Sequence, residues 1–188
     1  MEAARRRFAA RGVEATRINE ITEEADVGFG SFYNHFESKD AIVGAVLAEA
    51  VSNQGAELDT LTAELDDPAE VVSVAHRYFI RLARTDPDWA WLLIRLDVSH
   101  NVILEALEPY ARRDLARGVR AGRFAVADEP TALFASGGAL LTVMRTVLDG
   151  RAPKQVERYH AEGILRLFGL PPADAAEVAS RPMPVAAP

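Results

Sequence analysis

Apolar residues recur at helical spacing through almost the whole chain, and this periodicity restricts the fold more than any other feature of the sequence. Stripes spaced by three and four residues cover residues 71–82, 89–96, 133–148 and 156–168. Such stripes indicate amphipathic helices, each with one face turned toward a core. No segment alternates apolar and polar residues for long, which argues against a β-sheet. The sequence therefore predicts an all-α fold of about nine helices.

Helix start signals divide the chain further. We expect Pro109 to begin a helix that ends at Ala121, and Pro153 to open the last helix. Residues 171–188 contain five prolines and no apolar stripe, which predicts a flexible tail. Three acid–proline pairs suit the first turn of a helix, where an acidic cap precedes a proline: Asp67-Pro68, Asp86-Pro87 and Glu129-Pro130.

Composition limits the class of protein. The chain has 188 residues, 49% hydrophobic and 26% charged, which fits one or two small globular domains. It contains no cysteine, so disulfides and thiolate chemistry are excluded and a cytoplasmic location is favoured. The sequence shows no secretion signal and no apolar run long enough to predict a membrane span. The net charge of −7 means that any nucleic-acid contact must use a local basic face.

The first part of the chain shows three short helices followed by a longer one. A helix is expected over residues 2–11, and a second one follows the capping residue Thr16. A glycine-containing turn over residues 26–28 leads to a helix over residues 29–36, and Ser38 caps the longer fourth helix. Two short helices joined by such a turn form the helix-turn-helix pattern, whose second helix enters the major groove of DNA.

A helical wheel divides residues 29–36 into an inner and an outer face. Phe32 and Phe36 lie together and are expected to point to the core. The opposite face is small and polar, and on it Asn34 can pair with adenine while Gly30 lets the backbone approach base edges. Flanking residues suited to phosphate contacts are Arg17, Tyr33, His35 and Lys39.

The stretch from Phe8 to Ile42 resembles the DNA-binding domain of TetR-family transcriptional regulators. The resemblance lies in Gly30-Ser31-Phe32-Tyr33-Asn34-His35-Phe36 followed by Ser38-Lys39. It implies that Tyr33, His35 and Lys39 bind phosphates, and that Gly30 and Asn34 approach bases. Gly28 and Phe29 depart from the residues common in the family. The full predicted DNA-binding set is Arg17, Gly28, Phe29, Gly30, Ser31, Tyr33, Asn34, His35 and Lys39.

The resemblance also implies a role for the rest of the chain, namely effector binding and dimerisation. We expect helices over residues 129–150 and 153–168 to pair with their symmetry mates in a four-helix bundle. Small residues at 136–139 and at Gly163 would allow the close helix approach that such a bundle needs. The predicted domains are a DNA-binding domain over 1–45, an effector-binding and dimerisation domain over 46–170, and the tail over 171–188.

Residues 69–121 hold both tryptophans and several polar groups that a plain core does not need. A mostly apolar cavity with a few polar groups is typical of a small-molecule site. We therefore expect an aromatic or lipophilic effector to bind in this region. Its binding would release DNA through a shift of the segment beginning at Pro87 against the helix that starts at Ser38. The predicted lining residues are His76, Phe79, Trp89, Trp91, Arg95, His100 and Met144.

Three classes of function stay open. The first is a ligand-responsive repressor that binds a pseudo-palindromic DNA operator as a homodimer. The second is a helical enzyme that retains the motif, and the third is a module for protein contact. No orienting acid accompanies Ser99 and His100, and the four histidines lack the spacing of a metal site. Gly28 and Gly30 do not begin a dinucleotide loop, because Tyr33 occupies its last glycine position. We therefore predict no enzyme activity, no cofactor, no metal and no membrane partner.

Overall fold

The computed structural model describes residues 1–95 and 97–184, and within them it leaves the side chains of residues 9, 92, 95 and 97–106 undescribed. Helices are the only regular secondary structure of the described residues, which confirms the predicted all-α fold class. Its helices are α1 (Glu2–Arg11), α2 (Ile18–Glu24), α3 (Phe29–Tyr33), α4 (Lys39–Thr62), α5 (Pro68–Thr85), α6 (Pro87–Arg95), α7 (Asp97–Arg120), α8 (Glu129–Leu148), α9 (Val156–Leu167) and α10 (Pro172–Ser180).

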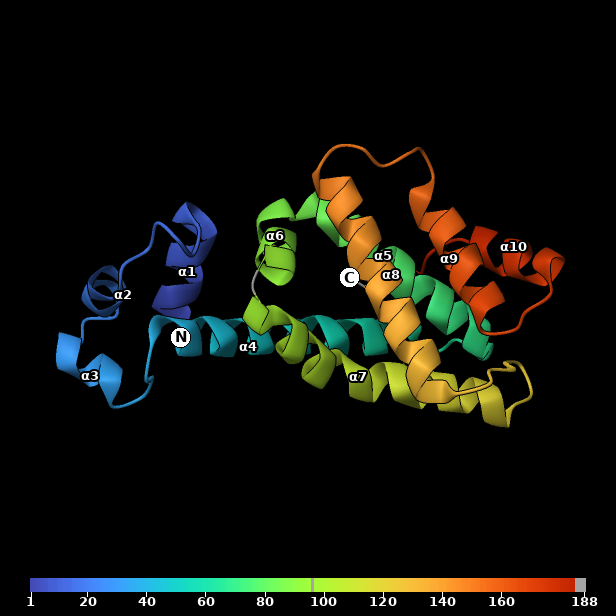
Figure 1. The fold of residues 1–188 in the computed structure, drawn as a ribbon, viewed down its shortest axis with the longest axis horizontal. Coiled ribbons are helices and arrows are strands. Elements are labelled where there is room, and N and C mark those ends of the chain that lie inside the picture. The colour runs from blue at the N-terminus through green and yellow to red at the C-terminus, as the bar shows by residue number, and fades with distance from the viewer. Residues whose placement is uncertain (96, 185–188) are drawn as a thin grey trace.

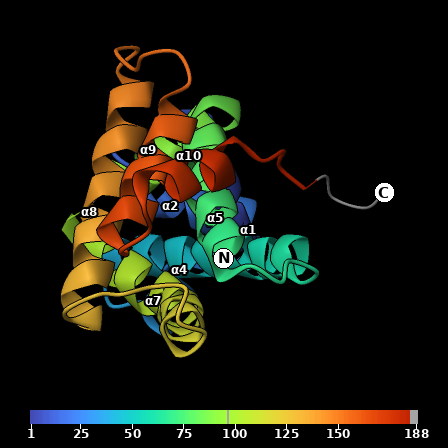
Figure 2. The same cartoon turned by 90° about the vertical axis from the view of Figure 1, so that its right-hand side faces the viewer.

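The long helix α4 is the axis of the molecule. In Figure 1, α1, α2 and α3 gather at its N-terminal end, and α5 to α10 gather along its C-terminal part. Figure 2, turned by a right angle, shows α8 at the outer edge of the molecule, with α5 further inside. The molecule is therefore elongated, with a small helical head joined to a larger helical body through one helix.

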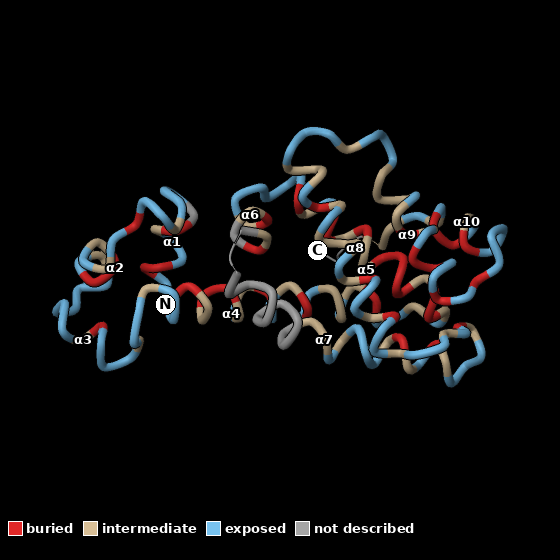
Figure 3. The backbone as a smooth tube through the Cα atoms, in the orientation of Figure 1, coloured by how far each residue is buried: buried red, intermediate tan, exposed pale blue. Residues whose placement is uncertain are grey.

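Buried side chains form a core in the head and two further cores in the body (Figure 3). The head core contains Phe8 of α1, Ile21 of α2 and Phe32 of α3, closed by the first turns of α4 as far as Val46. The next residue of α4, Leu47, already belongs to the core of the body. Because both cores share α4, the orientation of the head depends directly on this helix.

Side-chain caps start several helices as the sequence indicates. The Asp67 carboxylate accepts a hydrogen bond from the amide of Ala69 at 2.9 Å, and the Ser38 hydroxyl accepts one from the amide of Ala41 at 3.1 Å. At α8 the cap is Asp128, one residue before the acid expected in that role, and its carboxylate accepts from the amide of Thr131 at 2.8 Å. These caps satisfy amides that the first turn leaves unpaired.

The second helix starts later than expected, and the third is shorter than expected. Thr16 does not cap α2, because its buried hydroxyl instead donates to the carbonyl oxygen of Gly12 at 2.8 Å. The cap position is Arg17, whose amide donates to the Glu20 carboxylate at 2.8 Å. The helix expected over residues 29–36 ends at Tyr33, and the chain then continues as a turn.

Two predicted helix starts are wrong. Pro109 lies inside α7 rather than at its beginning. A proline removes one backbone hydrogen bond, yet α7 continues through it and packs against both α4 and α8. Pro153 does not open α9, which begins at Val156 after Gln155 adopts a left-handed conformation with φ 61°.

The prediction of a flexible tail is also wrong for residues 172–180, which form α10. This helix buries Ala175, Val178 and Ala179 in the core shared with α9. Proline at the start of the helix is compatible with helical geometry, so the proline content misled the prediction. Beyond the helix, Arg181 is held by an ion pair of 2.7 Å with Glu70 of α5.

The helix α8 is unusually apolar for its position. Its length and composition would suffice to cross a membrane, although a single such helix is weak evidence of a membrane protein. Most of it is not buried within the chain, and Phe134 is 59% exposed. A large exposed apolar surface on a helix marks a site of contact with another molecule.

Candidate functional site

The nine residues predicted to contact DNA lie together around α3 and the starts of α2 and α4. Seven of them are exposed, and only Ser31 and Lys39 are half-buried. The rings of Phe29 and Tyr33 are more than half exposed and contact each other edge to face, with centroids 5.6 Å apart. Beneath them, Phe32 is buried and anchors the short helix to the head core. The helix is therefore held from below and presents its outer face to solvent.

The backbone of α3 is also accessible from outside. Apart from its chain neighbours and the nearby backbone of its own helix, no atom lies within 4 Å of the position that a Cβ would take on Gly30. A flat partner could therefore come into van der Waals contact with the helix backbone here. This openness agrees with the expectation that a base edge approaches Gly30 closely.

Ion pairs within the head determine which of its cations remain available. Arg17 and Lys39 take part in no ion pair within the described part of the chain, and the Lys39 ammonium donates only to the carbonyl of Glu14 at 3.5 Å. The head therefore still carries two cations, near α3, that no carboxylate of the described chain neutralises. By contrast, four arginines of α1 are paired with glutamates: Arg5 with Glu2 at 2.9 Å, Arg6 with Glu24 at 2.8 Å, Arg7 also with Glu24, and Arg11 with Glu20 at 2.8 Å.

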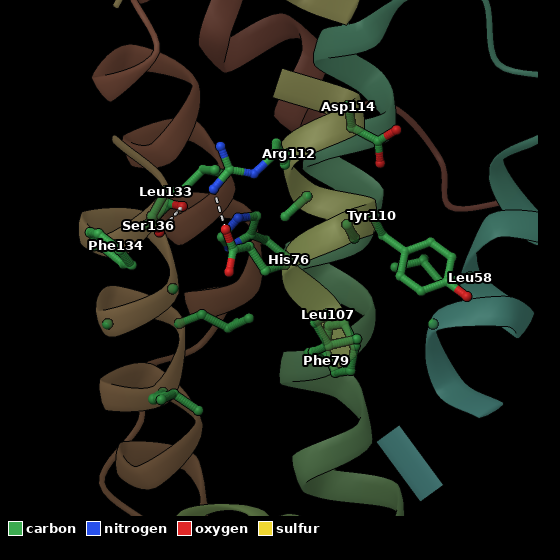
Figure 4. Close-up of a pocket in the computed structure, with 18 of the residues that line it drawn as sticks. Leu58, His76, Phe79, Leu107, Tyr110, Arg112, Asp114, Leu133, Phe134 and Ser136 are labelled. Atoms are coloured by element: carbon green, nitrogen blue, oxygen red, sulfur yellow. Dashed lines mark hydrogen bonds and ion pairs between the residues drawn. The ribbon is translucent and has the colours of Figure 1, made fainter. Parts of the chain in front are cut away.

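A second site lies in the body, where α4, α5, α6, α7 and α8 surround a cavity of about 340 Å³. Apolar side chains make up most of its wall, among them Phe79, Leu133 and Met144. Figure 4 labels lining residues that come from α4, α5, α7 and α8. A cavity of this size and character has the properties of a small-molecule site.

One polar group of the cavity wall is a histidine on α5. His76 lies deep in the body but keeps some accessible surface, because part of its ring faces the cavity. Its Nδ1 lies 3.0 Å from Nε2 of His160 on α9. Burial lowers the pKa of His76 to about 3 and that of His160 to about 4. Both rings are therefore neutral at neutral pH.

The charged groups of the wall come from α7. Glu108 and Arg112, one turn apart, form an ion pair that leaves the Arg112 side chain half exposed. Two residues further on, Asp114 has a mostly buried carboxylate, and this burial raises its pKa. The Arg113 guanidinium bridges Asp114 at 3.0 Å and Asp59 of α4 at 2.6 Å. The cavity thus has charged groups at its edge and a neutral imidazole in its wall.

Three of the residues predicted to line a pocket do so, namely His76, Phe79 and Met144. Trp89 does not belong to the wall, because its ring stacks against Phe79 within the core at a centroid distance of 6.5 Å. Trp91 is also outside the wall and lies beneath the Arg145 guanidinium, which is 4.7 Å from its ring centre. The predictions for Arg95 and His100 fall on side chains outside the described residues.

The polar side chains of α7 that line the cavity were not predicted from the sequence. The expected start of a helix at Pro109 separated Glu108 from Arg112 and so concealed their spacing. Tyr110 and Asp114 are likewise four residues apart, which places them on one face of a helix. A helical wheel drawn through Pro109 would have revealed both pairs.

The wall of the cavity is in direct contact with the helix that carries the head. The ring of Tyr110 points from α7 toward α4, beside Leu58 (Figure 4). A Cβ on Gly55 of α4 would lie only 2.9 Å from Cε2 of this ring, so a glycine is needed for the close packing. Any displacement of Tyr110 therefore acts on α4.

These features define a class: an all-α protein with a helix-turn-helix head, an exposed recognition helix and a ligand-sized cavity in its body. The family model for bacterial regulatory proteins of the tetR family matches residues 1–46, and the model for the tetracyclin repressor-like C-terminal domain matches residues 67–181. The chain belongs to the TetR family. This membership confirms the predicted class, a DNA-binding regulator rather than an enzyme.

Individual relatives agree with the family assignment. The crystal structure of RolR without ligand has a TM-score of 0.89 and 35% identity, and the match covers 99% of this chain and 97% of that one. RolR in complex with resorcinol has a TM-score of 0.88 at the same identity, covering 99% and 93%. The transcriptional repressor DhaR of Mycobacterium sp. (strain GP1) is 36% identical over 111 residues, which are 58% of this chain and 52% of DhaR. This chain thus matches about half the length of that repressor.

Proposed function

We propose that the chain is a ligand-responsive transcriptional repressor that binds DNA through α3 and its surroundings and releases it when a small molecule enters the cavity. The observation that carries this proposal is the direct contact between Tyr110 in the cavity wall and Gly55 on α4, the helix that also closes the head core. A ligand that moves Tyr110 would thereby move the recognition helix. The movement that transmits ligand binding to the head would then be a shift of α7 against α4, and not the shift of the segment beginning at Pro87 that the sequence predicts.

The DNA contacts proposed for the head use the exposed side chains around α3 and the two cations that form no ion pair within the described part of the chain. Arg17, Tyr33, His35 and Lys39 contact phosphates, while Gly30 and Asn34 approach bases, with Gly28, Phe29 and Ser31 at the same surface. Residues 1–45 act as the DNA-binding domain and the helical body as the effector-binding and dimerisation domain. A pseudo-palindromic operator follows if two copies bind together, with α3 helices about 34–36 Å apart or somewhat more.

The dimer is proposed to form through α8 and α9. Gly137, Gly138 and Gly163 have no atom within 4 Å of the position that a Cβ would take, so packing within the chain does not explain them. Glycine inside a helix costs about 1 kcal/mol relative to alanine, which favours a contact with a second copy. Phe134 and Tyr159 are more than half exposed on the same two helices.

The effector proposed is a small hydroxylated aromatic molecule. Dry protein cavities of about 150 Å³ hold benzene, so a cavity of about 340 Å³ has room for one substituted ring. RolR, which resembles this chain over nearly its whole length, has been crystallised with resorcinol. The apolar wall suits the ring, while His76 is placed to hydrogen-bond a hydroxyl group.

The test measures DNA release by fluorescence anisotropy. The probe is labelled DNA from the region upstream of the protein's own coding sequence, titrated first with protein and then with resorcinol. We expect tight binding that resorcinol reverses. Leu140→Trp, which fills the cavity, should bind the same DNA within about twofold of wild type but lose the response.

The control is Leu65→Trp, the same substitution outside the cavity, which should keep both properties. Absence of specific DNA binding would favour the enzyme or protein-contact alternatives. A full resorcinol response in Leu140→Trp would show that the effector acts elsewhere.

A further inference from the structure

The histidine pair between α5 and α9 has a property that neither residue has alone. His76 Nδ1 and His160 Nε2 are 3.0 Å apart, with ring planes inclined by 45°. At this distance one nitrogen must donate a proton and the other must accept it, since two bare nitrogens or two N–H groups would repel. The nitrogens left over are His76 Nε2 and His160 Nδ1.

Proton counting links these two outer nitrogens. A neutral imidazole carries one N–H, and burial keeps both rings neutral by lowering the pKa of each. If His76 Nδ1 donates, His76 Nε2 is bare and His160 holds its proton on Nδ1. If His160 Nε2 donates, His76 carries its proton on Nε2 and His160 Nδ1 is bare. The two rings therefore always have the same tautomer, and their outer nitrogens have opposite roles.

His76 is one of the polar groups of the cavity wall with an atom free to meet an uncharged ligand. Among the described residues of the wall, Glu108 is paired with Arg112, and Asp114 with Arg113. The Ser136 hydroxyl donates to the carbonyl of Leu133 at 2.9 Å. His76 uses only Nδ1 within the protein, so Nε2 is available to a ligand.

We propose that His76 Nε2 hydrogen-bonds an uncharged hydroxyl or carbonyl oxygen of the effector, and that His160 is the positioning residue that sets whether Nε2 donates or accepts. The inference rests on the proposed effector site and extends it to a ligand class. A neutral imidazole pair favours neutral oxygen groups over a carboxylate, because it offers no positive charge. The two tautomers let the same nitrogen serve a hydroxyl that donates or a carbonyl that accepts.

The experiment compares phenol with toluene, which has nearly the same shape but no hydrogen-bonding group. Affinities are measured by isothermal titration calorimetry on the full chain. His76→Leu should lower phenol affinity by about three- to tenfold, the usual worth of one neutral hydrogen bond, and leave toluene affinity unchanged or higher. His160→Leu should lower phenol affinity without affecting toluene, and His160→Gln, which can donate or accept, should restore much of it.

The double variant His76→Leu/His160→Leu separates positioning from packing. If His160 acts through His76, the double variant binds phenol no more weakly than His76→Leu alone. Additive losses, or an equal loss of toluene affinity in His160→Leu, would overturn the proposal and make His160 a packing residue. If neither phenol nor toluene binds the wild-type protein, the effector site itself is wrong. If phenol and toluene both bind, and the histidine variants change the two affinities equally, the effector site stands and only the role proposed for the histidine pair fails.

Nitrogen-15 NMR of labelled histidine gives a readout that stability effects cannot imitate. The chemical shifts of the two ring nitrogens report which one carries the proton. His76 and His160 should show the same tautomer in the free protein, and any change of population on adding phenol should be equal in both rings. Opposite tautomers in the two rings would contradict the proposal.

Discussion

Side chains of the head divide into those engaged within the chain and those available to a partner. Phe32 is buried, and the arginines of α1 are paired with glutamates. The side chain of Asn34, by contrast, forms no hydrogen bond within the described part of the chain, and Lys39 has a single long contact at 3.5 Å. Substitutions of these two residues should therefore change DNA binding without disturbing the fold.

The expected effects of the two substitutions differ in kind. Lys39→Ala should weaken binding to all DNA sequences alike and lower the slope of log affinity against log salt by about one, because one phosphate contact is lost. Asn34→Ala should instead reduce discrimination at one base pair by about 1–3 kcal/mol. Affinities for a set of operator variants, measured at several salt concentrations, distinguish these outcomes. An unchanged ranking of operators in Asn34→Ala would remove its assigned role.

At the same scale, the sequence predicts the exposed face of α3 better than it predicts the lining of the cavity. The outer face of α3 follows from local periodicity, since residues 29–36 lie on one short stretch of chain. The cavity depends on which helices meet in space. Nothing in the sequence near His76 shows that His160, 84 residues later, lies 3.0 Å away. Trp89 and Trp91 were predicted to line the cavity because residues 69–121 are rich in aromatic side chains. Aromatic side chains also fill cores, and these two lie outside the cavity wall.

Among the elements, α10 shows that a short helix rich in alanine and proline can be part of the core. Its buried face consists of small side chains, so it lacks the strong apolar stripe by which longer helices are predicted. It is fixed at its end by Arg181, which also accepts, through its carbonyl oxygen, a hydrogen bond of 2.7 Å from Arg77. Local signals thus predicted helices with large apolar faces and missed one whose partners are distant in sequence.

Val178→Ala tests the contribution of α10 to stability. Val178 is fully buried, so removing its methyl groups should lower the free energy of unfolding by about 1–2 kcal/mol. Ser180→Ala, at an exposed position of the same helix, should change it by less than about 0.5 kcal/mol. Urea unfolding followed by circular dichroism gives both values. Equal midpoints for the two variants would mean that α10 does not pack in solution.

For the whole molecule, the glycines of α8 and α9 make the proposed dimer testable. Replacing one of them by alanine should stabilise a monomer but weaken the association of a dimer. In a monomer, Gly163→Ala adds a helix-favouring residue at an open position and should stabilise the protein by up to about 1 kcal/mol. In a dimer that packs closely at this point, the added methyl group should separate the helices and weaken association by at least about tenfold. We expect the second result.

Sedimentation velocity over a range of protein concentrations measures this association. Thr60→Ala, at an exposed position on α4, serves as the control and should leave the dimer unchanged. A wild-type protein that sediments as a monomer at micromolar concentration would contradict the dimer.

The continuity of α4 has a consequence for how such proteins can vary in length. Val46 belongs to the core of the head and Leu47 to that of the body, so no flexible linker separates the two. One residue inserted near this junction would advance the head by about 1.5 Å and rotate it by about 100°, so that α3 would face a different side of the molecule. An insertion of seven residues would nearly restore the angle while moving the head by about 10.5 Å. Lengths of α4 that preserve the orientation of the head relative to the body therefore recur at intervals of about seven residues, and each interval changes the distance between the two cores.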